Sequence, residues 1–331
     1  MNMTPGIRKQ QGLSLVELMI ASVLGLLIMA GVIQLFLSSK ATYRVQEGMS
    51  RVQEVGRYAV DRLSYDIRQA GYIGCGNLDR IPLNVIADDP PDFSPGRAVV
   101  GYEGGAGWTN PTTIAHVAAT DVIEVRGASE LSLTLTGNMA AENANIQVKD
   151  NRLGVKSGEA LFITDCVAAD LFRATTVSTE GGGTKVTIAH SEAKNSDNFL
   201  SKAYRADAEV MAFREKTYFV GRADGAADAS LYLYDGNQAL ELVRGIEAFE
   251  LEFGVDTNRD FAIDDYRGAS SVADWNEVRS VRVALLVSTT EDVIPGAEAH
   301  SFDVLGRTVD VDDRRLRQVF SADIAVRNRL F

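Results

Sequence analysis

The chain has few of the residues from which catalytic and metal centres are usually built. Its 331 residues include only 3 histidines and 2 cysteines. The cysteines, Cys75 and Cys166, do not form a CxxC pair, which excludes a cysteine-based zinc site of the usual spacing. The histidines lie far apart without HxH or HExxH spacing, and no GxSxG elbow is present. We therefore expect no enzyme.

An excess of positive charge is also absent. Lys and Arg number 33 against 45 Asp and Glu, which gives a formal net charge of -12 and a pI near 4.8. Such a chain offers no basic face to neutralise phosphates, so it is not expected to bind nucleic acid. Hydrophobic residues make up 46%, which is ordinary for a globular protein that buries a core. Proteins are the expected partners.

Acidic residues are missing from the first twelve positions, which carry Arg8 and Lys9. An apolar run follows and ends near Leu37, interrupted by one charge, Glu17. The run is long enough to cross a bilayer as a helix, and the flanking cations favour a cytoplasmic amino terminus. A secretory signal peptide would have a shorter core, and a plain signal anchor gives no reason for a carboxylate inside the run.

The residues around this carboxylate form a recognisable motif. Gly12 is followed by apolar Leu13, and Glu17 stands four positions after Leu13. The segment resembles the class III signal of type IV prepilins and pseudopilins. The resemblance implies that a prepilin peptidase cleaves after Gly12 and methylates the amino group of Leu13. It also implies that Glu17 is the assembly glutamate, which compensates the terminal ammonium of a neighbouring subunit in a low-dielectric filament core.

Proline is absent between Leu13 and Ala70, so a single long helix is possible, and Gly71 is a reasonable stop. Beyond Ser38 the helix turns polar but keeps one narrow apolar stripe. The stripe consists of Val45, Met49, Val52, Gly56, Ala59, Leu63, Ile67 and Ala70. We expect it to pack against the protein's own sheet; a coiled coil with a partner is the alternative.

After Gly71 the pattern predicts an α+β protein of pilin type, in which the long helix packs on a large, mostly antiparallel sheet. We divide the chain into a leader (1–12), a transmembrane helix (13–37), its amphipathic continuation (38–71), an irregular connection rich in proline and glycine (72–112) and a β-rich domain (113–331). Period-two alternation marks the expected strands at 121–126, 131–135, 160–165, 185–189, 208–213, 217–220, 231–234, 246–253, 278–288 and 323–327.

The carboxyl-terminal part also resembles a known family. The segments LVRGIEAFELEFGVDTNRD, WNEVRSVRVALLVST and RRLRQVFSADIAVRNRLF follow one another there. This order resembles the PilW family of type IV minor pilins, with the J-type pseudopilins of type II secretion as relatives and as the alternative identity. The resemblance implies a single-pass inner-membrane protein with a periplasmic domain that later reaches the pilus tip. It also implies a role in priming assembly, adhesion and twitching motility. The implied partners are other minor pilins, the major pilin, the assembly platform, the prepilin peptidase and a tip adhesin.

One loop has the oxygen spacing of a calcium site. Asp256, Asn258, Asp260 and Asp264 are candidate ligands, because alternate positions let oxygens converge on one cation. Phe261 stands where an EF-hand needs glycine, so a polar hairpin tip is the alternative. A membrane-anchored, calcium-dependent adhesin module is accordingly a further candidate function.

Export would place Cys75 and Cys166 in an oxidising compartment, where they would form one disulfide. Two buried free thiols are the alternative, because sequence alone does not show how closely the two residues approach.

Overall fold

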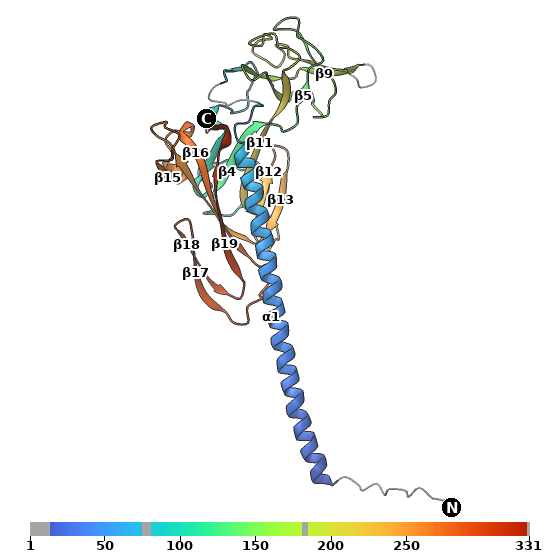
Figure 1. The fold of residues 1–331 in the computed structure, drawn as a ribbon, viewed down its shortest axis with the longest axis vertical. Helices are drawn as coiled ribbons and strands as arrows, with labels where there is room; N and C mark the ends of the chain where they lie inside the picture. The colour runs from blue at the N-terminus through green and yellow to red at the C-terminus, as the bar shows by residue number, and fades with distance from the viewer. Residues whose placement is uncertain (1–13, 75–80, 181–184, 330–331) are drawn as a thin grey trace, which may run out of the picture.

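A single helix dominates the shape of the molecule. The computed structural model describes residues 14–74, 81–180 and 185–329. Helix α1 runs from Leu15 to Gln69, 55 residues, so it is about 80 Å long at the usual rise per residue. Its first half projects away from a β-rich body, and its second half lies along that body (Figure 1).

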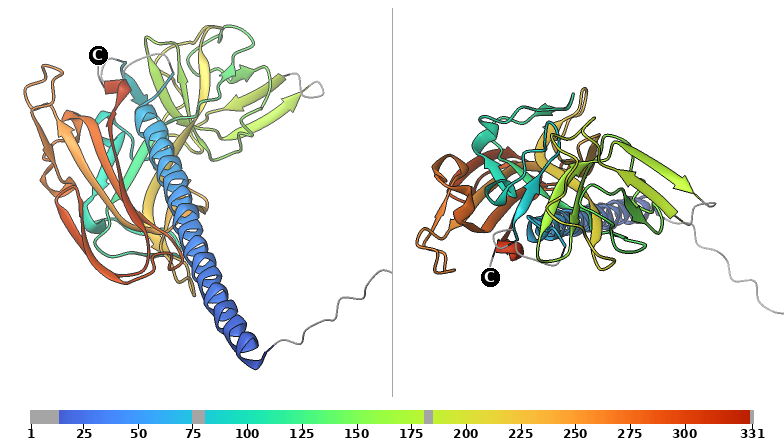
Figure 2. Two further views of the ribbon diagram at one scale, coloured as in Figure 1. Left: turned by 60° about the horizontal axis from the view of Figure 1, so that its bottom comes forward. Right: turned by 90° about the horizontal axis from the view of Figure 1, so that it is seen from above.

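The second half of α1 buries one face, as the apolar stripe predicts. From Val52 onward the predicted stripe residues are all buried, whereas Met49 at the start of the stripe is 38% exposed. The helix contacts three strands of the body, β19 (Arg317–Ala325), β16 (Val278–Ser288) and β13 (Ala239–Arg244). Figure 2 shows the body lying against the upper half of the helix while the lower half stands free. Packing on the protein's own sheet is therefore observed for this stripe.

Most strands of the body form one large sheet of ten strands. They are β1 (Leu83–Val85), β2 (Val99–Tyr102), β3 (Ala115–His116), β4 (Val122–Ala128), β5 (Leu133–Thr134), β7 (Ala160–Thr164), β8 (Ala169–Arg173), β11 (Glu209–Arg222), β12 (Ser230–Tyr234) and β13 (Ala239–Arg244). Three further strands, β6 (Ile146–Val148), β9 (Thr176–Glu180) and β10 (Lys185–Ala189), form a small sheet. Among the described strand pairs only β1 and β8 run parallel, so the expected antiparallel α+β fold is confirmed.

Strand β11 joins two regions of the body. Its first residues pair with β5 and β7, and the rest pairs with β3, β4 and β12. The sequence predicted two separate strands here, 208–213 and 217–220; this was wrong, because the polar residues between them continue the ladder opposite β4. The strands from β5 to β10 form a region that we call the distal module, residues 129–180 and 185–208. It lies at the end of the body farthest from the start of α1 (Figure 1).

A second sheet covers α1 from the other side. It contains β15 (Asp265–Arg267), β14 (Ile246–Val255), β16 (Val278–Ser288) and β19 (Arg317–Ala325), in that order. The hairpin of β17 (Glu298–Val304) and β18 (Arg307–Asp313) packs on it through apolar side chains around Val304. Short 3-10 turns complete the fold: η1 (Pro95–Arg97), η2 (Glu103–Gly105), η4 (Ala269–Ser271), η5 (Trp275–Glu277) and η6 (Arg327–Arg329).

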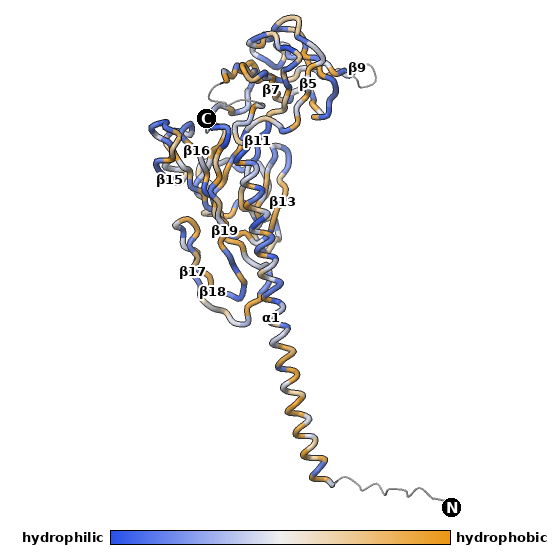
Figure 3. The backbone as a smooth tube through the Cα atoms, in the orientation of Figure 1, coloured by the Kyte–Doolittle hydropathy of each residue, from blue (hydrophilic) through white to orange (hydrophobic). Residues whose placement is uncertain are grey.

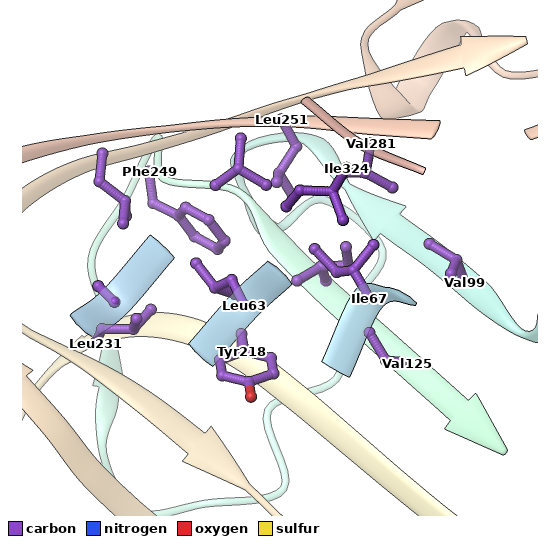
Figure 4. Close-up of a cluster of buried hydrophobic side chains, with 14 of the residues drawn as sticks. Leu63, Ile67, Val99, Val125, Tyr218, Leu231, Phe249, Leu251, Val281 and Ile324 are labelled. Carbon is purple, nitrogen blue, oxygen red and sulfur yellow. The ribbon is translucent and has the colours of Figure 1, made fainter. Parts of the chain in front are cut away.

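The main core forms where α1 meets both sheets. Leu63 and Ile67 of the helix are fully buried among Tyr218 of β11, Phe249 of β14 and Ile324 of β19 (Figure 4). The distal module has its own core, built around Phe172 and Tyr204. The helix is thus fixed to the body by strands that lie far from it in the sequence, β11, β14 and β19.

Two glycines let α1 approach the second sheet closely. A Cβ built on Gly56 would lie 2.3 Å from ring carbons of Phe320 on β19, and a Cβ on Gly48 would lie 3.2 Å from Thr289. By contrast, Gly25 and Gly31 in the projecting half have nothing within 4 Å of a built Cβ. Close packing of the helix on its own body therefore depends on Gly56.

Gly56→Ala is expected to lower the free energy of unfolding by about 1–3 kcal/mol, because the new methyl group displaces the Phe320 ring. Chemical denaturation of the purified full-length chain in detergent measures this. Gly25→Ala is the control, since the same gain in helix propensity meets no neighbour there. Equal or higher stability of Gly56→Ala would contradict the close approach.

Candidate functional site

The described part of α1 begins with a well-formed cap. The Ser14 hydroxyl accepts a hydrogen bond from the Val16 amide at 3.3 Å, and the Ser14 amide donates to Glu17 Oε2 at 3.0 Å. These two residues form a capping box, which pairs amides that a helix start leaves without partners. Gly12 and Leu13, the predicted cleavage and methylation positions, lie outside the described residues.

The helix that follows this cap has no protein around it. An 18-residue window of α1 reaches a mean hydropathy of 2.5, and none of that window is buried. Side chains from Leu15 to Leu37 are bare and mostly apolar, as the orange lower half of the tube shows (Figure 3). Leaving so many large apolar side chains in water costs on the order of tens of kcal/mol, more than a domain's whole stability. This half therefore fits a bilayer or a bundle of other helices better than it fits water.

Glu17 is the charged residue in this bare segment. In the described chain its carboxylate is held by the capping box at the first turn, directed toward the amino-terminal end of the helix. An ammonium group of a second chain arriving at this end would meet a carboxylate already oriented toward it. The assembly role of Glu17 stays a prediction that this geometry favours.

The other end of the helix is tied to the body by a buried charge that the sequence reading missed. The Asp66 side chain is 1% exposed and accepts hydrogen bonds from Lys216 Nζ at 2.7 Å and from the Tyr218 hydroxyl. Arg62, one turn earlier, lies 3.2 Å away. Burial raises the pKa of Tyr218, which keeps its phenol protonated and donating. The only sequence signal was a carboxylate adjacent to the apolar stripe with an arginine four residues before it.

The predicted disulfide has one partner outside the described residues, Cys75, so the pairing stays a prediction. Cys166 lies in the turn between β7 and β8 with a φ of 70°. Gly74 packs nearby, since its built Cβ would lie 3.0 Å from Thr164. Gly74, the residue before Cys75, therefore lies close to the turn that holds Cys166.

In the loop between β14 and β15, the candidate calcium ligands make hydrogen bonds within the turn. Asp256 is fully buried and accepts from the amides of Asp260 and Phe261, both at 3.1 Å. Its other contact is Arg279 Nε at 3.2 Å, a pair whose side chains are 0% and 7% exposed. Asp264 accepts from the amide and hydroxyl of Thr257 at 2.8 and 2.6 Å.

The four candidates do not form a ligand shell here. Among the described residues, no group of three or more His, Cys, Asp or Glu is placed to hold a metal ion. Asn258 and Asp260 bond to each other and to nearby amides. The polar hairpin tip that the sequence left open accounts for each of these contacts, and calcium binding stays a prediction.

Asp256→Ala is expected to destabilise the fold by about 3–5 kcal/mol, because it removes the buried carboxylate that pairs with Arg279. Denaturation curves of the full-length variant and the unsubstituted chain, each with excess calcium and with chelator, measure the effect. We expect the same loss in both solutions. A loss seen only with calcium would show instead that Asp256 acts as a metal ligand.

Glu250 pairs with Arg307 of the β17–β18 hairpin, and the buried carboxylate of Asp121 interacts electrostatically with both residues. Arg307, at the start of β18, lies 2.5 Å from Glu250 of β14 and also donates to the Ala119 carbonyl. Asp121 accepts from the amides of Gly104 and Leu251 at 2.7 and 2.8 Å. Burial raises the pKa of Asp121 to about 6 and that of Glu250 to about 7.

The folded state binds the proton of the Glu250 carboxyl more tightly than the unfolded chain does. The contribution of Glu250 to stability therefore falls as pH rises through about 7. We expect the unfolding free energy of the unsubstituted chain, relative to Glu250→Gln, to decrease from pH 5.5 to pH 8. Thermal denaturation of both proteins across this range measures the difference. Burial lowers the pKa of His116, which makes stability rise with pH. This opposite trend is present in both proteins, so the comparison cancels it. A difference that grows with pH would show that the pairing with Arg307 outweighs burial.

Comparison with known families gives two matches. A family model described as "Type IV Pilus-assembly protein W" matches residues 217–328, and one described as "Prokaryotic N-terminal methylation motif" matches residues 7–33. Searches of curated proteins and of solved structures return no match. The first match covers β12 to β19, which hold α1, and the second covers the capping box and the bare apolar helix. Together they support a type IV pilus minor pilin of the PilW family, so the resemblance indicated by the sequence is confirmed.

Proposed function

We propose that this type IV pilus minor pilin of the PilW family belongs to the complex that primes pilus assembly and then remains at the filament tip. The observation that carries the proposal is the bare apolar half of α1 with Glu17 in its first turn. Such a helix is stable in a bilayer and equally stable among other helices of its kind. It therefore suits a subunit that leaves a membrane to enter a filament.

The position at the tip is favoured by the distal module. This region lies at the end of the body farthest from the bare helix (Figure 1) and lies entirely outside the stretch that matches the family model. A body that extends beyond the helix in this direction leaves less room for a subunit stacked above it. We infer that the module faces outward, where adhesion to a surface or binding of a tip adhesin would take place.

In this proposal the chain is first a single-pass inner-membrane protein with its body in the periplasm. The prepilin peptidase removes residues 1–12 and methylates Leu13, and the assembly platform then lifts α1 out of the bilayer. Other minor pilins and the major pilin supply the helices that replace lipid around the apolar half. The same body supports twitching indirectly, by allowing filaments to start.

Glu17→Gln and Glu17→Ala are both expected to reduce incorporation into sheared pili by about tenfold or more, because the neighbouring ammonium loses its countercharge. The Gln variant keeps the acceptor oxygen of the capping box, so it separates the charge from the cap. Immunoblots of sheared pili and counts of pili per cell measure the effect.

Processing should continue in both Glu17 variants, whereas Gly12→Ser should block it and leave a heavier precursor on a gel. This control distinguishes failed assembly from failed cleavage. Normal incorporation of Glu17→Gln would show that the carboxylate serves the cap alone and would contradict the proposed assembly role.

A further inference from the structure

The large sheet has a second face, which points away from α1. Neighbouring side chains of a strand point to opposite faces of its sheet. In β11 and β12, Tyr218 and Leu231 pack in the main core with α1, whereas Phe219 and Tyr232 belong to a separate apolar cluster. This cluster therefore lies on the side of the sheet opposite to the helix, and a contact made through α1 does not involve it.

The loop that precedes β3 packs on this cluster. The ring of Trp108 lies against that of Phe219, with centroids 5.1 Å apart, and Phe219 stacks on Tyr232 at 5.6 Å. Ile114 reaches the sheet because Gly221 has no side chain: a Cβ built there would lie 2.7 Å from Ile114. These contacts hold the loop on the sheet, next to the turn that joins β12 to β13.

A small hollow with a volume of about 250 Å³ separates this loop from the turn. Its polar lining consists of hydroxyl and amide groups, and the ring of a tyrosine supplies the largest apolar surface. These groups belong to Thr112, Thr113, Tyr234, Asn237 and Gln238. Among the described residues that line the hollow, none is charged. Because nothing in the wall would balance a charge, the hollow favours a neutral ligand.

The loop side of the hollow is fixed by hydrogen bonds within the loop. Asn110 Oδ1 accepts from the amide and the hydroxyl of Thr112, both at 2.9 Å. Asn110 Nδ2 donates to the Ile114 carbonyl at 2.8 Å, and the Thr112 hydroxyl accepts from the Ile114 amide at 3.1 Å. The hydroxyl of Thr113 has no partner in the described part of the chain.

The turn side of the hollow is fixed in the same way. Asp235 Oδ1 accepts from the amides of Asn237 and Gln238, both at 2.9 Å. The Tyr234 hydroxyl donates to the Gly236 carbonyl at 2.9 Å. The side-chain amides of Asn237 and Gln238 make no hydrogen bond to other described residues. A ligand thus meets a backbone that is already ordered and amides that are available to it.

This combination of groups matches the surface of a sugar ring. One face of a pyranose carries C–H groups, which pack on an aromatic side chain, and its edge carries hydroxyl groups, which both donate and accept. Each side-chain amide likewise offers donors and an acceptor. The hollow is smaller than the roughly 300–1,000 Å³ of sites for drug-sized ligands, so it suits a single ring better than an extended peptide.

We propose that this hollow binds one neutral pyranose residue of a glycan. Tyr234 packs against the C–H face of the ring, while the hydroxyl groups of the sugar bond to Asn237 and Gln238. The glycan is either a surface carbohydrate outside the cell or the N-acetylated sugar backbone of the cell wall. Strands β12 and β13 lie beside α1 and not in the distal module (Figure 1), so sugar binding here does not depend on the proposed position at the tip.

Saturation-transfer difference NMR on the purified full-length chain tests the proposal. The detergent must lack a sugar head group, because a glycoside detergent would compete for the hollow. The probes are the methyl glycosides of glucose, galactose and mannose, and the disaccharide N,N′-diacetylchitobiose. We expect saturable binding of at least one probe. Binding of a hexoside would support a surface carbohydrate as the source, and binding confined to the disaccharide would support the cell wall.

Asn237→Ala combined with Gln238→Ala is expected to weaken binding about tenfold, because two hydrogen bonds are lost. Both side chains are exposed, so the fold should remain intact. The matched control, Asn145→Ala with Gln147→Ala, removes two exposed amides from the distal module and should leave the affinity unchanged. Tyr234→Ala should also weaken binding about tenfold, whereas Tyr234→Phe keeps the ring and should retain most of the affinity.

Four results would overturn the proposal. They are no binding of any of the four probes, an affinity that the Asn237 and Gln238 pair leaves unchanged, a loss of affinity in the control pair, and stronger binding of methyl glucuronide or of a proline-rich peptide than of the neutral sugars. Thermal denaturation checks the fold of each variant. If Tyr234→Ala proves unstable, the exposed amide pair decides the question without it.

Discussion

The structure depends on one constraint: a single helix must be stable in two different surroundings. The lower half of α1 exposes apolar side chains from Leu15 to Leu37 and packs on nothing in the described chain. The upper half buries one face in the core that both sheets share. Because a continuous helix transmits position rigidly along its length, whatever surrounds the lower half determines where the body stands. The fold is therefore organised around holding the upper half firmly.

Two features of different kind hold it. Gly56 removes a side chain so that Phe320 and the helix backbone come close together, which favours dense packing. Asp66 adds a buried charge that bonds to Lys216 and Tyr218 of β11, which is costly unless every contact is made. The first feature stabilises the contact with the second sheet, and the second permits only one rotation of the helix against the large sheet. Together they resist a pull on the apolar end without relying on buried apolar area alone.

Sequence alone predicted the parts of this design that repeat and missed those that depend on one contact. The uninterrupted helix, its stripe and the strand at 278–288 follow from periodic patterns that span many residues. Strand β11 was split because Glu215 and Lys216 interrupt the alternation, although their backbones continue the ladder. Hairpin β17–β18 was not among the predicted strands. Asp256 shows the remaining limit: alternate oxygens describe a cation loop and a hydrogen-bonded turn equally well, and nothing in the sequence shows that Asp256 pairs with Arg279.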